Sequence, residues 1–202
     1  LSEQEQARLE GRYSHIIPTL GEETAEKMAR EVSEAREAKD SVGGVISCRV
    51  YGLPAGLGEP LYDKLTSRLA SAMLGINAAR GFELGEGFAL ASMRGSVAND
   101  PFHLNAEGRV AQVSNRGGGT LGGITTGAPL TFRVAFKPTS SIGLPQETVR
   151  RDGQAVRLEI TGRHDPCLAL RAVPVVEAMT ALTLMDFYLL HARSTQRQGG
   201  ED

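Results

Sequence analysis

The 202-residue sequence contains no tryptophan, only two cysteines and no run of 18 apolar residues. Cys48 and Cys167 are too few and too far apart for a disulfide framework, and neither belongs to a Cys-x-x-Cys pair of the kind that binds zinc. We therefore expect a reducing, cytoplasmic location and no metal site. The missing apolar run, and a start without a basic segment before an apolar one, predict no membrane span and no targeting segment.

An excess of charge of one sign is also lacking, because 22 basic residues face 24 acidic ones. So small an imbalance creates no field that would recruit nucleic acid or an anionic membrane. We therefore expect the partner to be a small molecule or another protein chain. The hydrophobic content of 41% is enough for a sizeable core, and the length predicts one domain over residues 1–202.

The first half of the chain shows helical and strand-like patterns in turn. Residues 22–39 place apolar side chains at three- and four-residue steps, the period of an amphipathic helix, and a Gly-Gly pair is expected to end it. Residues 45–50 indicate a strand with a buried Cys48. A second helix is predicted over residues 60–76, with Pro60 near its first turn.

Short strands are predicted in the second half. Residues 81–84 and 88–92 indicate strands, and a long loop is expected over residues 93–109. Residues 130–136 alternate apolar and polar side chains with the period of two that is typical of a half-buried strand. The pair Asp152-Gly153 predicts the turn of a hairpin.

The chain closes with a helix that is predicted from Pro174 to about His191, and residues 193–202 are expected to form a disordered tail. The resulting order of helix, strand, helix, several strands and helix is not the regular alternation of a parallel sheet. The predicted fold class is therefore α+β.

A glycine-rich segment at residues 117–127 formally contains Gly-x-Gly-x-x-Gly. A dinucleotide-binding fingerprint needs a strand before it and a helix after it, whereas a strand follows here, so a Rossmann site is not favoured. Two interpretations stay open. The segment is a flexible hairpin loop, or its missing side chains let the backbone approach a flat ligand closely.

The strand predicted at residues 130–136 is followed by the run Lys-Pro-Thr-Ser-Ser at residues 137–141. One cation, several hydroxyls and the backbone N–H groups after the proline can together bind a phosphate. In the alternative interpretation, this is a capped loop whose hydroxyls bond its own backbone.

The sequence Gly-Arg-His-Asp-Pro-Cys at residues 162–167 joins a predicted strand to the last helix. Arg163 could hold an anion at this strand end, and Asp165 could accept a proton. Alternatively, the two residues form an ion pair, and Asp165 with Pro166 begins a turn. The triplet alone does not separate these interpretations.

The remaining polar residues receive no chemical role. His15 and His103 are lone histidines in predicted loops, and His191 is expected at a helix end, where a cation suits the helix dipole. Asp186 lies in an apolar helical stretch, either on a solvated face or as a buried partner at a contact between chains.

Several stretches resemble chorismate synthase along nearly the whole chain. In the family's order they are GLPAGLGEPLYDKL, MLGINAARGFELGEGF, MRGS with NDPF, GGGTLGGITTGAP, VAFKPTSSI, and GRHDPC followed by RAVPVVEAM. The resemblance is to the C-terminal part of that family, and the N-terminal part is not matched.

The resemblance implies a flavin site and one catalytic residue. The FMN-binding residues that it implies are Asn77, Ala78, Gly122, Lys137, Pro138, Thr139, Ser140, Ser141 and Arg163. Residues 137–141 would face the flavin phosphate, and Arg163 would position anionic groups of FMN or substrate. Asp165 matches an aspartate of the family beside flavin and substrate, and we expect it to assist proton removal at substrate C6.

The reaction that the resemblance implies is the anti-1,4-elimination of phosphate from 5-enolpyruvylshikimate 3-phosphate to give chorismate, a step of the shikimate pathway to aromatic amino acids. Such an enzyme is an FMN-dependent carbon–oxygen lyase without net redox change, in which reduced FMN supplies electron density. NADPH serves some members of the family as the flavin reductant.

The family's fold is a β-α-β sandwich of helices between antiparallel sheets, assembled as a homotetramer. This sequence should hold about half of it, so a layer that lacks its partner would expose apolar surface. We expect the chain alone to be inactive, because the histidines and arginines that protonate and grip the substrate belong to the N-terminal part. The alternatives are a non-catalytic module that binds FMN or phosphate, and a structural oligomerisation domain.

Overall fold

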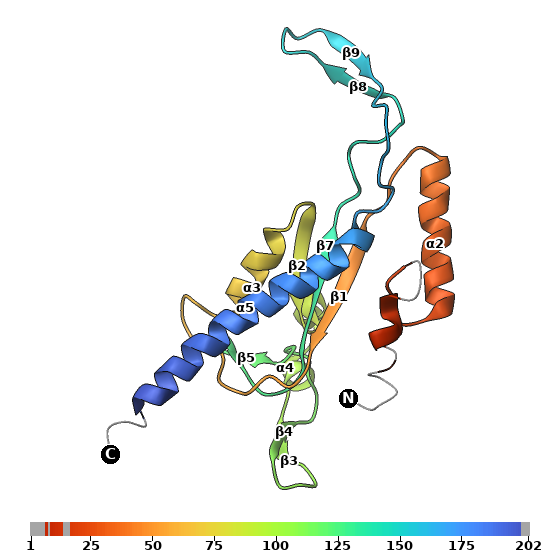
Figure 1. Ribbon diagram of the computed structural model, residues 1–202. Coiled ribbons are helices and arrows are strands. Elements are labelled where there is room, and N and C mark those ends of the chain that lie inside the picture. Colours follow the sequence, from red (N-terminus) through yellow and green to blue (C-terminus); the bar gives the residue numbers. More distant parts are fainter. Residues whose placement is uncertain (1–6, 8, 14–16, 199–202) are drawn as a thin grey trace. The chain divides into compact units, whose positions relative to one another are not determined.

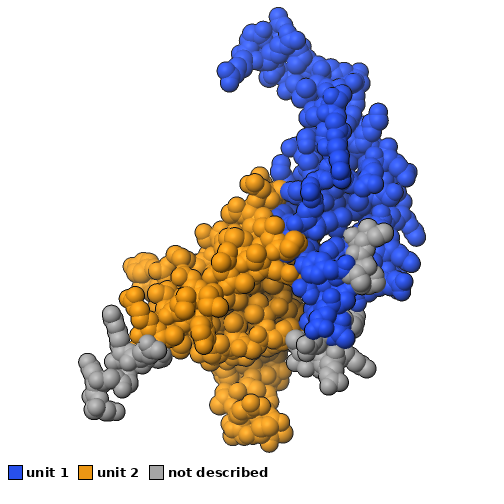
Figure 2. All heavy atoms as spheres, in the orientation of Figure 1, with its two compact units in different colours: residues 1–44, 136–173 blue, residues 45–135, 174–202 orange. Residues whose placement is uncertain are grey.

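The computed structural model describes residues 7, 9–13 and 17–198, which divide into two compact units (Figure 2). The first unit comprises residues 1–44 and 136–173, and the second comprises residues 45–135 and 174–202. Each unit joins two separate stretches of chain. Neither therefore corresponds to a continuous part of the single domain that the sequence predicts.

A three-stranded sheet with the order β1-β7-β2 forms the centre of the second unit (Figure 1). Its strands are β1 (Gly44–Val50), β2 (Ala79–Leu84) and β7 (Leu130–Phe136). Alternate side chains of β7 are buried, namely Leu130, Phe132, Val134 and Phe136. The predicted half-buried strand is thus confirmed, and its position between two neighbours explains why it is the most buried of the three.

Burial along β1 differs from the prediction. Ile46 is the buried side chain of this strand, whereas Cys48 is only half-buried. The Cys48 sulfur lies 4.0 Å from the Thr180 hydroxyl of the last helix, so it faces the rim of the helix–sheet contact.

The helix α3 (Leu65–Leu74) covers part of the sheet and buries Leu65, Leu69 and Met73 completely. It begins five residues later than predicted, and Pro60 lies outside it. The reason is local, because Tyr62 adopts a left-handed conformation with φ of 61° and thereby interrupts any helix across residues 60–64.

The last helix, α5 (Ala169–Gln198), lies beside α3 on the sheet (Figure 1). Its buried residues within the second unit recur at three- and four-residue steps, namely Val176, Thr180, Leu184 and Phe187. The helix starts before Pro174, because a proline near a helix start removes few hydrogen bonds. It continues past His191 to Gln198, so residues 193–198 are helical where a disordered tail is predicted, and residues 199–202 lie outside the described part.

The opposite face of α5 is apolar and exposed. Leu182 is 66% exposed, Met185 55% and Leu189 61%. By length and composition alone, residues 169–194 could cross a membrane, a property that core helices of soluble proteins share. The face of α5 that packs on the sheet shows that this helix is part of a folded unit, and the exposed face offers a surface for contact.

The first unit contains the helix α2 (Glu22–Glu37) and an antiparallel hairpin of β8 (Gln146–Val149) and β9 (Ala155–Leu158). Both were predicted, but the Gly-Gly pair does not end α2. The helix is closed by Lys39, whose φ is 57°, with Lys39 N–H bonded to the Arg36 carbonyl and Asp40 N–H bonded to the Ala35 carbonyl. This is the Schellman arrangement with lysine in the position that usually holds glycine.

Short elements complete the second unit, and one of them corrects a prediction. Residues 88–92, predicted as a strand, belong to the 3-10 helix η2 (Gly87–Ser92), because Gly85 and Gly87 take left-handed φ values of 57° and 54° that turn the chain after β2. The loop expected at residues 93–109 contains regular structure as well. The remaining elements are η1 (Gly11–Tyr13) in the first unit, and α4 (Gly95–Ala98), β3 (Phe102–Leu104), β4 (Val110–Gln112), β5 (Thr120–Leu121) and β6 (Ile124–Thr125). The class is α+β, as predicted.

Candidate functional site

The residues predicted to bind a ligand fall into two groups, one in each unit. The second unit holds Asn77, Ala78 and Gly122. The first unit holds residues 137–141 with Arg163 and Asp165. Each group has its own geometry.

Asn77 and Ala78 form the turn that joins α3 to β2. The Ala79 N–H donates to the Ile76 carbonyl at 3.1 Å, which closes the turn. Ala78 has a φ of 68°, a left-handed conformation that costs a residue with a Cβ about 1–2 kcal/mol. Strained backbone of this kind is concentrated at ligand sites and tight turns. The Asn77 side chain is exposed and therefore accessible at this turn.

Gly122 lies at the tip of the β5–β6 hairpin. Leu121 pairs with Ile124, so Gly122 and Gly123 are the two loop residues, with φ values of 63° and 96°. Two positive φ values in a two-residue loop are typical of the type I′ turn, which glycine favours. Nothing lies within 4 Å of a Cβ added to Gly122, whereas one on Gly123 would meet Lys64 at 2.6 Å. The Gly122 backbone is thus the open side of this turn.

The glycine-rich segment is a structured loop that Asp100 holds at its start. One Asp100 oxygen accepts hydrogen bonds from the Ser114 hydroxyl at 2.6 Å and the Arg116 N–H at 2.8 Å, and the other accepts from the Gly117 N–H at 2.7 Å. Burial alone would raise the pKa of Asp100, but these hydrogen bonds and the Arg116 charge outweigh it and hold the pKa below its ordinary value. Asp100 is therefore an ionised anchor at neutral pH.

Two buried polar atoms of the same loop have no hydrogen-bond partner among the described residues. They are Oδ1 of Asn115 and Nε of Arg116. The Asn115 amide nitrogen donates to the Pro129 carbonyl at 2.8 Å, so the side chain is held while its oxygen stays unsatisfied. Buried polar atoms are nearly always paired in folded proteins, so these two are available to a further group.

The first unit places residues 137–141 directly after β7. The Thr139 carbonyl accepts a hydrogen bond from the Ser41 hydroxyl at 2.7 Å, which fixes the loop. Oγ1 of Thr139 is buried and has no partner within the described ranges. In the same part of the chain, the Ser140 and Ser141 hydroxyls also make no hydrogen bond, so the interpretation as a loop capped by its own hydroxyls is wrong.

Asp165 makes an ion pair, but not with the arginine that the sequence suggests. Its Oδ2 lies 2.7 Å from Nη1 of Arg171, in the first turn of α5. Arg163 is exposed and has no ion pair or hydrogen bond among the described residues, so the Arg163–Asp165 pair is wrong. The Asp165 side chain keeps 32% of its surface exposed and remains accessible to a proton donor.

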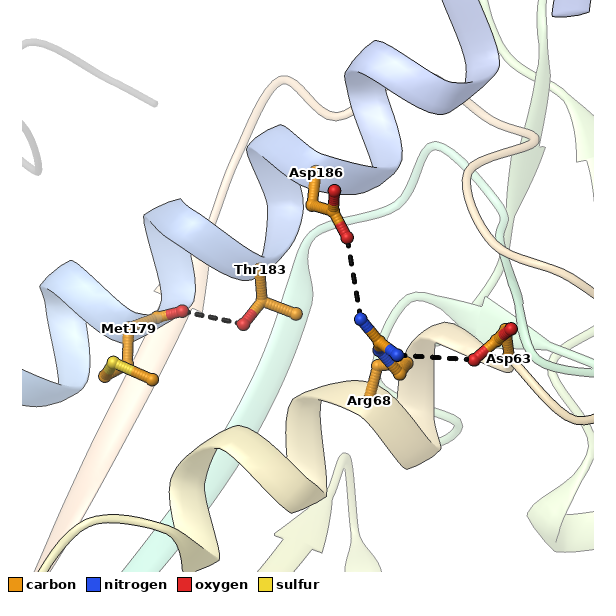
Figure 3. A network of polar contacts seen from close by, with 5 residues as sticks. All are labelled: Asp63, Arg68, Met179, Thr183 and Asp186. Atoms are coloured by element: carbon orange, nitrogen blue, oxygen red, sulfur yellow. Dashed lines mark hydrogen bonds and ion pairs between the residues drawn. The ribbon is translucent and has the colours of Figure 1, made fainter.

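Two cavities are lined by described residues, and the first borders the predicted motif through Gly162, His164 and Pro166, the chain neighbours of Arg163 and Asp165. A cavity of about 420 Å³ in the first unit is lined in part by Arg36, Lys39 and His164. A cavity of about 600 Å³ in the second unit lies beside Arg68, whose guanidinium is 3.5 Å from Asp63 and 3.6 Å from Asp186 (Figure 3). Within this chain, Asp186 is thus a solvent-exposed ion-pair partner between α3 and α5.

The histidines occupy separate places. His103 lies on β3 rather than in a loop, and His191 lies inside α5 rather than at its end. The His164 ring is 3.2 Å from the Ile160 carbonyl. His15 lies outside the described residues. None of these positions changes the prediction that the histidines carry no role.

Sequence reasoning missed Asp100 and Arg171. Asp100 belongs to the quoted stretch NDPF, but its three donors lie 14 to 17 residues further along the chain, beyond any local pattern. Arg171 follows Asp165 by six residues, across the change from turn to helix. A sequence motif contains no signal for either contact.

The two units therefore define an α+β protein with a fixed glycine loop and a second loop that carries one cation, Lys137, and an unpaired buried hydroxyl. A model of the chorismate synthase family matches residues 4–189. The chain is 55% identical over 162 residues to a chorismate synthase of Porphyromonas gingivalis (80% of this chain, 44% of the relative). It is 47% identical over 181 residues to that of Synechocystis sp. (90% and 50%).

A solved structure described as a crystal structure of chorismate synthase matches with a TM-score of 0.75 at 28% identity, covering 94% of this chain and 50% of that one. The chain belongs to the chorismate synthase family. It spans about half the length of the relatives that it matches.

Proposed function

We propose that this chain supplies the C-terminal half of a chorismate synthase, which eliminates phosphate from 5-enolpyruvylshikimate 3-phosphate in an anti-1,4 sense. Family membership supports the reaction class. The observation that carries the proposal for the site is the buried, unpartnered Oγ1 of Thr139 in the loop that begins with Lys137. We also propose a cytoplasmic location.

Residues 137–141 fit the phosphate group of FMN. A phosphate offers several acceptor oxygens and a double negative charge, and it is bound by cations, hydroxyls and backbone N–H groups. Lys137 supplies the cation, while Thr139, Ser140 and Ser141 supply hydroxyls that bond nothing else in the described structure. An unsatisfied buried hydroxyl costs about 1–3 kcal/mol, so a ligand that satisfies it is favoured.

The predicted residues outside this loop have proposed roles of their own. The open backbone at Asn77, Ala78 and Gly122 is suited to a flat ring, because no side chain prevents close approach at Gly122. Arg163 is available to position anionic groups of flavin or substrate. Reduced FMN, when bound, supplies electron density for the departure of phosphate, and NADPH is a candidate reductant for it.

Asp165 is the proposed proton acceptor at substrate C6. A general base must be accessible and oriented, and Asp165 is both, because part of its surface is exposed while Arg171 holds one oxygen. Arg171 would also keep the carboxylate from rotating toward Arg163, leaving that cation for the ligand.

We infer that the chain alone does not turn over substrate, since it matches only half of each relative. The histidines and arginines that protonate and grip the substrate would come from the other half. The exposed face of α5 is a suitable surface for that half or for further copies of the chain in a homo-oligomer.

The proposal is tested by anaerobic assay of the 202-residue protein with dithionite-reduced FMN and 5-enolpyruvylshikimate 3-phosphate, following chorismate. We expect no chorismate from the chain alone and recovered activity after mixing with the N-terminal half of a relative. Turnover by the chain alone would overturn the inferred division of labour. FMN binding without recovery by any N-terminal half would favour the alternative, a non-catalytic binding or oligomerisation module.

A further inference from the structure

The segment between α4 and β3 places one carboxylate against a distant turn. Asp100 accepts hydrogen bonds from Ser114, Arg116 and Gly117, and two of the three donors are backbone N–H groups. Hydrogen bonds to an ionised acceptor are roughly twice as strong as neutral ones. Asp100 therefore fixes the path of the main chain where the glycine loop starts.

The opposite side of the same turn is closed by backbone. Gly118 has a φ of 69°, and a Cβ there would lie 2.5 Å from the Gly85 nitrogen and 2.8 Å from the Thr131 carbonyl oxygen. The Gly85 and Glu86 N–H groups donate to the carbonyls of Thr131 and Arg116 at 2.8 and 2.9 Å. The turn is thus held between Asp100 on one side and the β2 end on the other.

The turn connects directly to the hairpin that carries Gly122. The Gly118 carbonyl accepts from the Thr131 N–H at 3.2 Å, and the Gly119 carbonyl accepts from the Thr126 N–H at 3.0 Å. Strand β5 begins at the next residue, Thr120, and ends one residue before Gly122. A shift of the turn would therefore move the Gly122 backbone.

We propose that Asp100 is a positioning residue, whose carboxylate sets the conformation of residues 114–123 and through them the place of the Gly122 backbone against the flavin. The flavin part rests on the proposed function. Asp100 itself is not proposed to touch a ligand, because both of its oxygens accept hydrogen bonds from the turn.

The test compares Asp100→Asn, Asp100→Glu and Ser114→Ala with the wild-type 202-residue chain. The amide of Asp100→Asn keeps one acceptor but places an NH₂ group against a backbone N–H, whereas Asp100→Glu retains the carboxylate. Asp152→Asn is the matched control, because Asp152 accepts a single backbone hydrogen bond, from Gln154 at 3.1 Å, in the β8–β9 turn of the other unit. The measurements are hydrogen exchange at residues 114–123 and the dissociation constant of oxidised FMN from flavin fluorescence.

We expect Asp100→Asn to speed exchange at Arg116, Gly117 and the Gly122–Gly123 turn and to weaken FMN by about tenfold or more, the equivalent of roughly 1.4 kcal/mol. Asp100→Glu should show part of the wild-type exchange protection and part of the wild-type FMN affinity. Ser114→Ala should change both quantities in the same direction as Asp100→Asn, but less. Asp152→Asn should match the wild type. If Asp100→Asn does not fold, the same two measurements on Ser114→Ala test the inference.

Wild-type exchange and wild-type FMN affinity in Asp100→Asn would overturn the inference, as would an equal loss in Asp152→Asn. If the wild-type chain does not bind FMN, the flavin part of the proposed function fails. Exchange at Gly122–Gly123 then decides by itself whether Asp100 positions the loop.

Discussion

Asp165 and Arg171 form a 2.7 Å ion pair that joins the Arg-His-Asp turn to the first turn of α5. The two arginines of this segment therefore differ in whether they are ion-paired. Arg171 orients the carboxylate from a helix, while Arg163 stays exposed and free of any ion pair within the described residues. Arg163 is thus left for the anionic ligand of the proposed function, while the Asp165 carboxylate is already held by Arg171.

Replacing Arg171 by alanine should lower turnover more than stability. The Arg171 side chain is 73% exposed, so its ion pair should contribute at most about 1 kcal/mol to the free energy of unfolding. A positioned general base contributes about 100- to 10,000-fold to rate, so we expect a fall in kcat of about tenfold or more for the chain combined with the N-terminal half of a relative. Lys27→Ala, which breaks the equally short but remote Lys27–Glu23 pair, is the control. Unchanged kcat in Arg171→Ala would show that Asp165 needs no orientation.

Replacing Thr139 by valine should separate binding from folding. Valine has nearly the same shape and removes the unsatisfied hydroxyl, so the free energy of unfolding should stay constant or rise by up to about 1–2 kcal/mol. FMN should bind more weakly, whereas riboflavin, which lacks the phosphate, should bind as to the wild type. Melting temperature and flavin titration measure the two effects, and equal loss for both flavins would contradict a phosphate role.

Alanine at Gly118 should destabilise the second unit more than alanine at Gly108. The two glycines have φ values of 69° and 71°, so the conformational penalty is matched. A Cβ at Gly118 would overlap backbone atoms, whereas nothing lies within 4 Å of one at Gly108. We expect the free energy of unfolding to fall by about 1 kcal/mol in Gly108→Ala and by at least about 2 kcal/mol more in Gly118→Ala, as measured by urea unfolding. Equal values would mean that the loop yields to the added methyl group.

The stability of the second unit should depend on Asp100 in acid. Because the pKa of Asp100 is lowered in the folded chain, its hydrogen bonds stabilise the fold above the pKa of the unfolded chain, and this contribution is lost as pH falls through the folded pKa. Asp100→Asn should therefore have a lower urea midpoint than the wild type at pH 7. When the pH falls below about 4, the midpoint of the variant should drop less than that of the wild type. If the urea midpoints of both proteins fall in parallel with pH, the Asp100 carboxylate is not a source of the acid dependence of stability.

The periodicity of apolar residues predicted the helices and strands that such a pattern is enough to define. The alternation of β7 follows from which face is buried, and the structure confirms it. The helix α2 forms as predicted, but of its apolar positions it buries Ala25 and Ala35 and leaves Met28 exposed. The start of α3 was wrong because a left-handed Tyr62 has no sequence signature, unlike a left-handed glycine. Residues 88–92 were assigned to a strand because apolar side chains alone do not distinguish a strand from a short helix.

The contacts of the site were beyond sequence reasoning for a different reason. The donors to Asp100 follow it in the chain only after β3 and β4. Asp165 pairs with Arg171 and not with Arg163, because α5 places the Arg171 side chain next to the Asp165 carboxylate. The motifs at residues 137–141 and 162–167 do lie in loops. The pairing of charged groups within them depends on tertiary placement, which a sequence pattern does not contain.

The exposed face of α5 should drive association of the isolated chain. Leu182 and Leu189 lie opposite the buried face, 66% and 61% exposed, so their substitution removes no core contact. A double variant with glutamine at both positions should therefore melt like the wild type but show a lower mass in light scattering at equal concentration. Leu104→Gln on β3, where the side chain is 69% exposed, is the matched control. If Leu104→Gln dissociates the chain and the helix variant does not, the contact lies on the β3–β4 hairpin, and α5 is left free for the proposed N-terminal half.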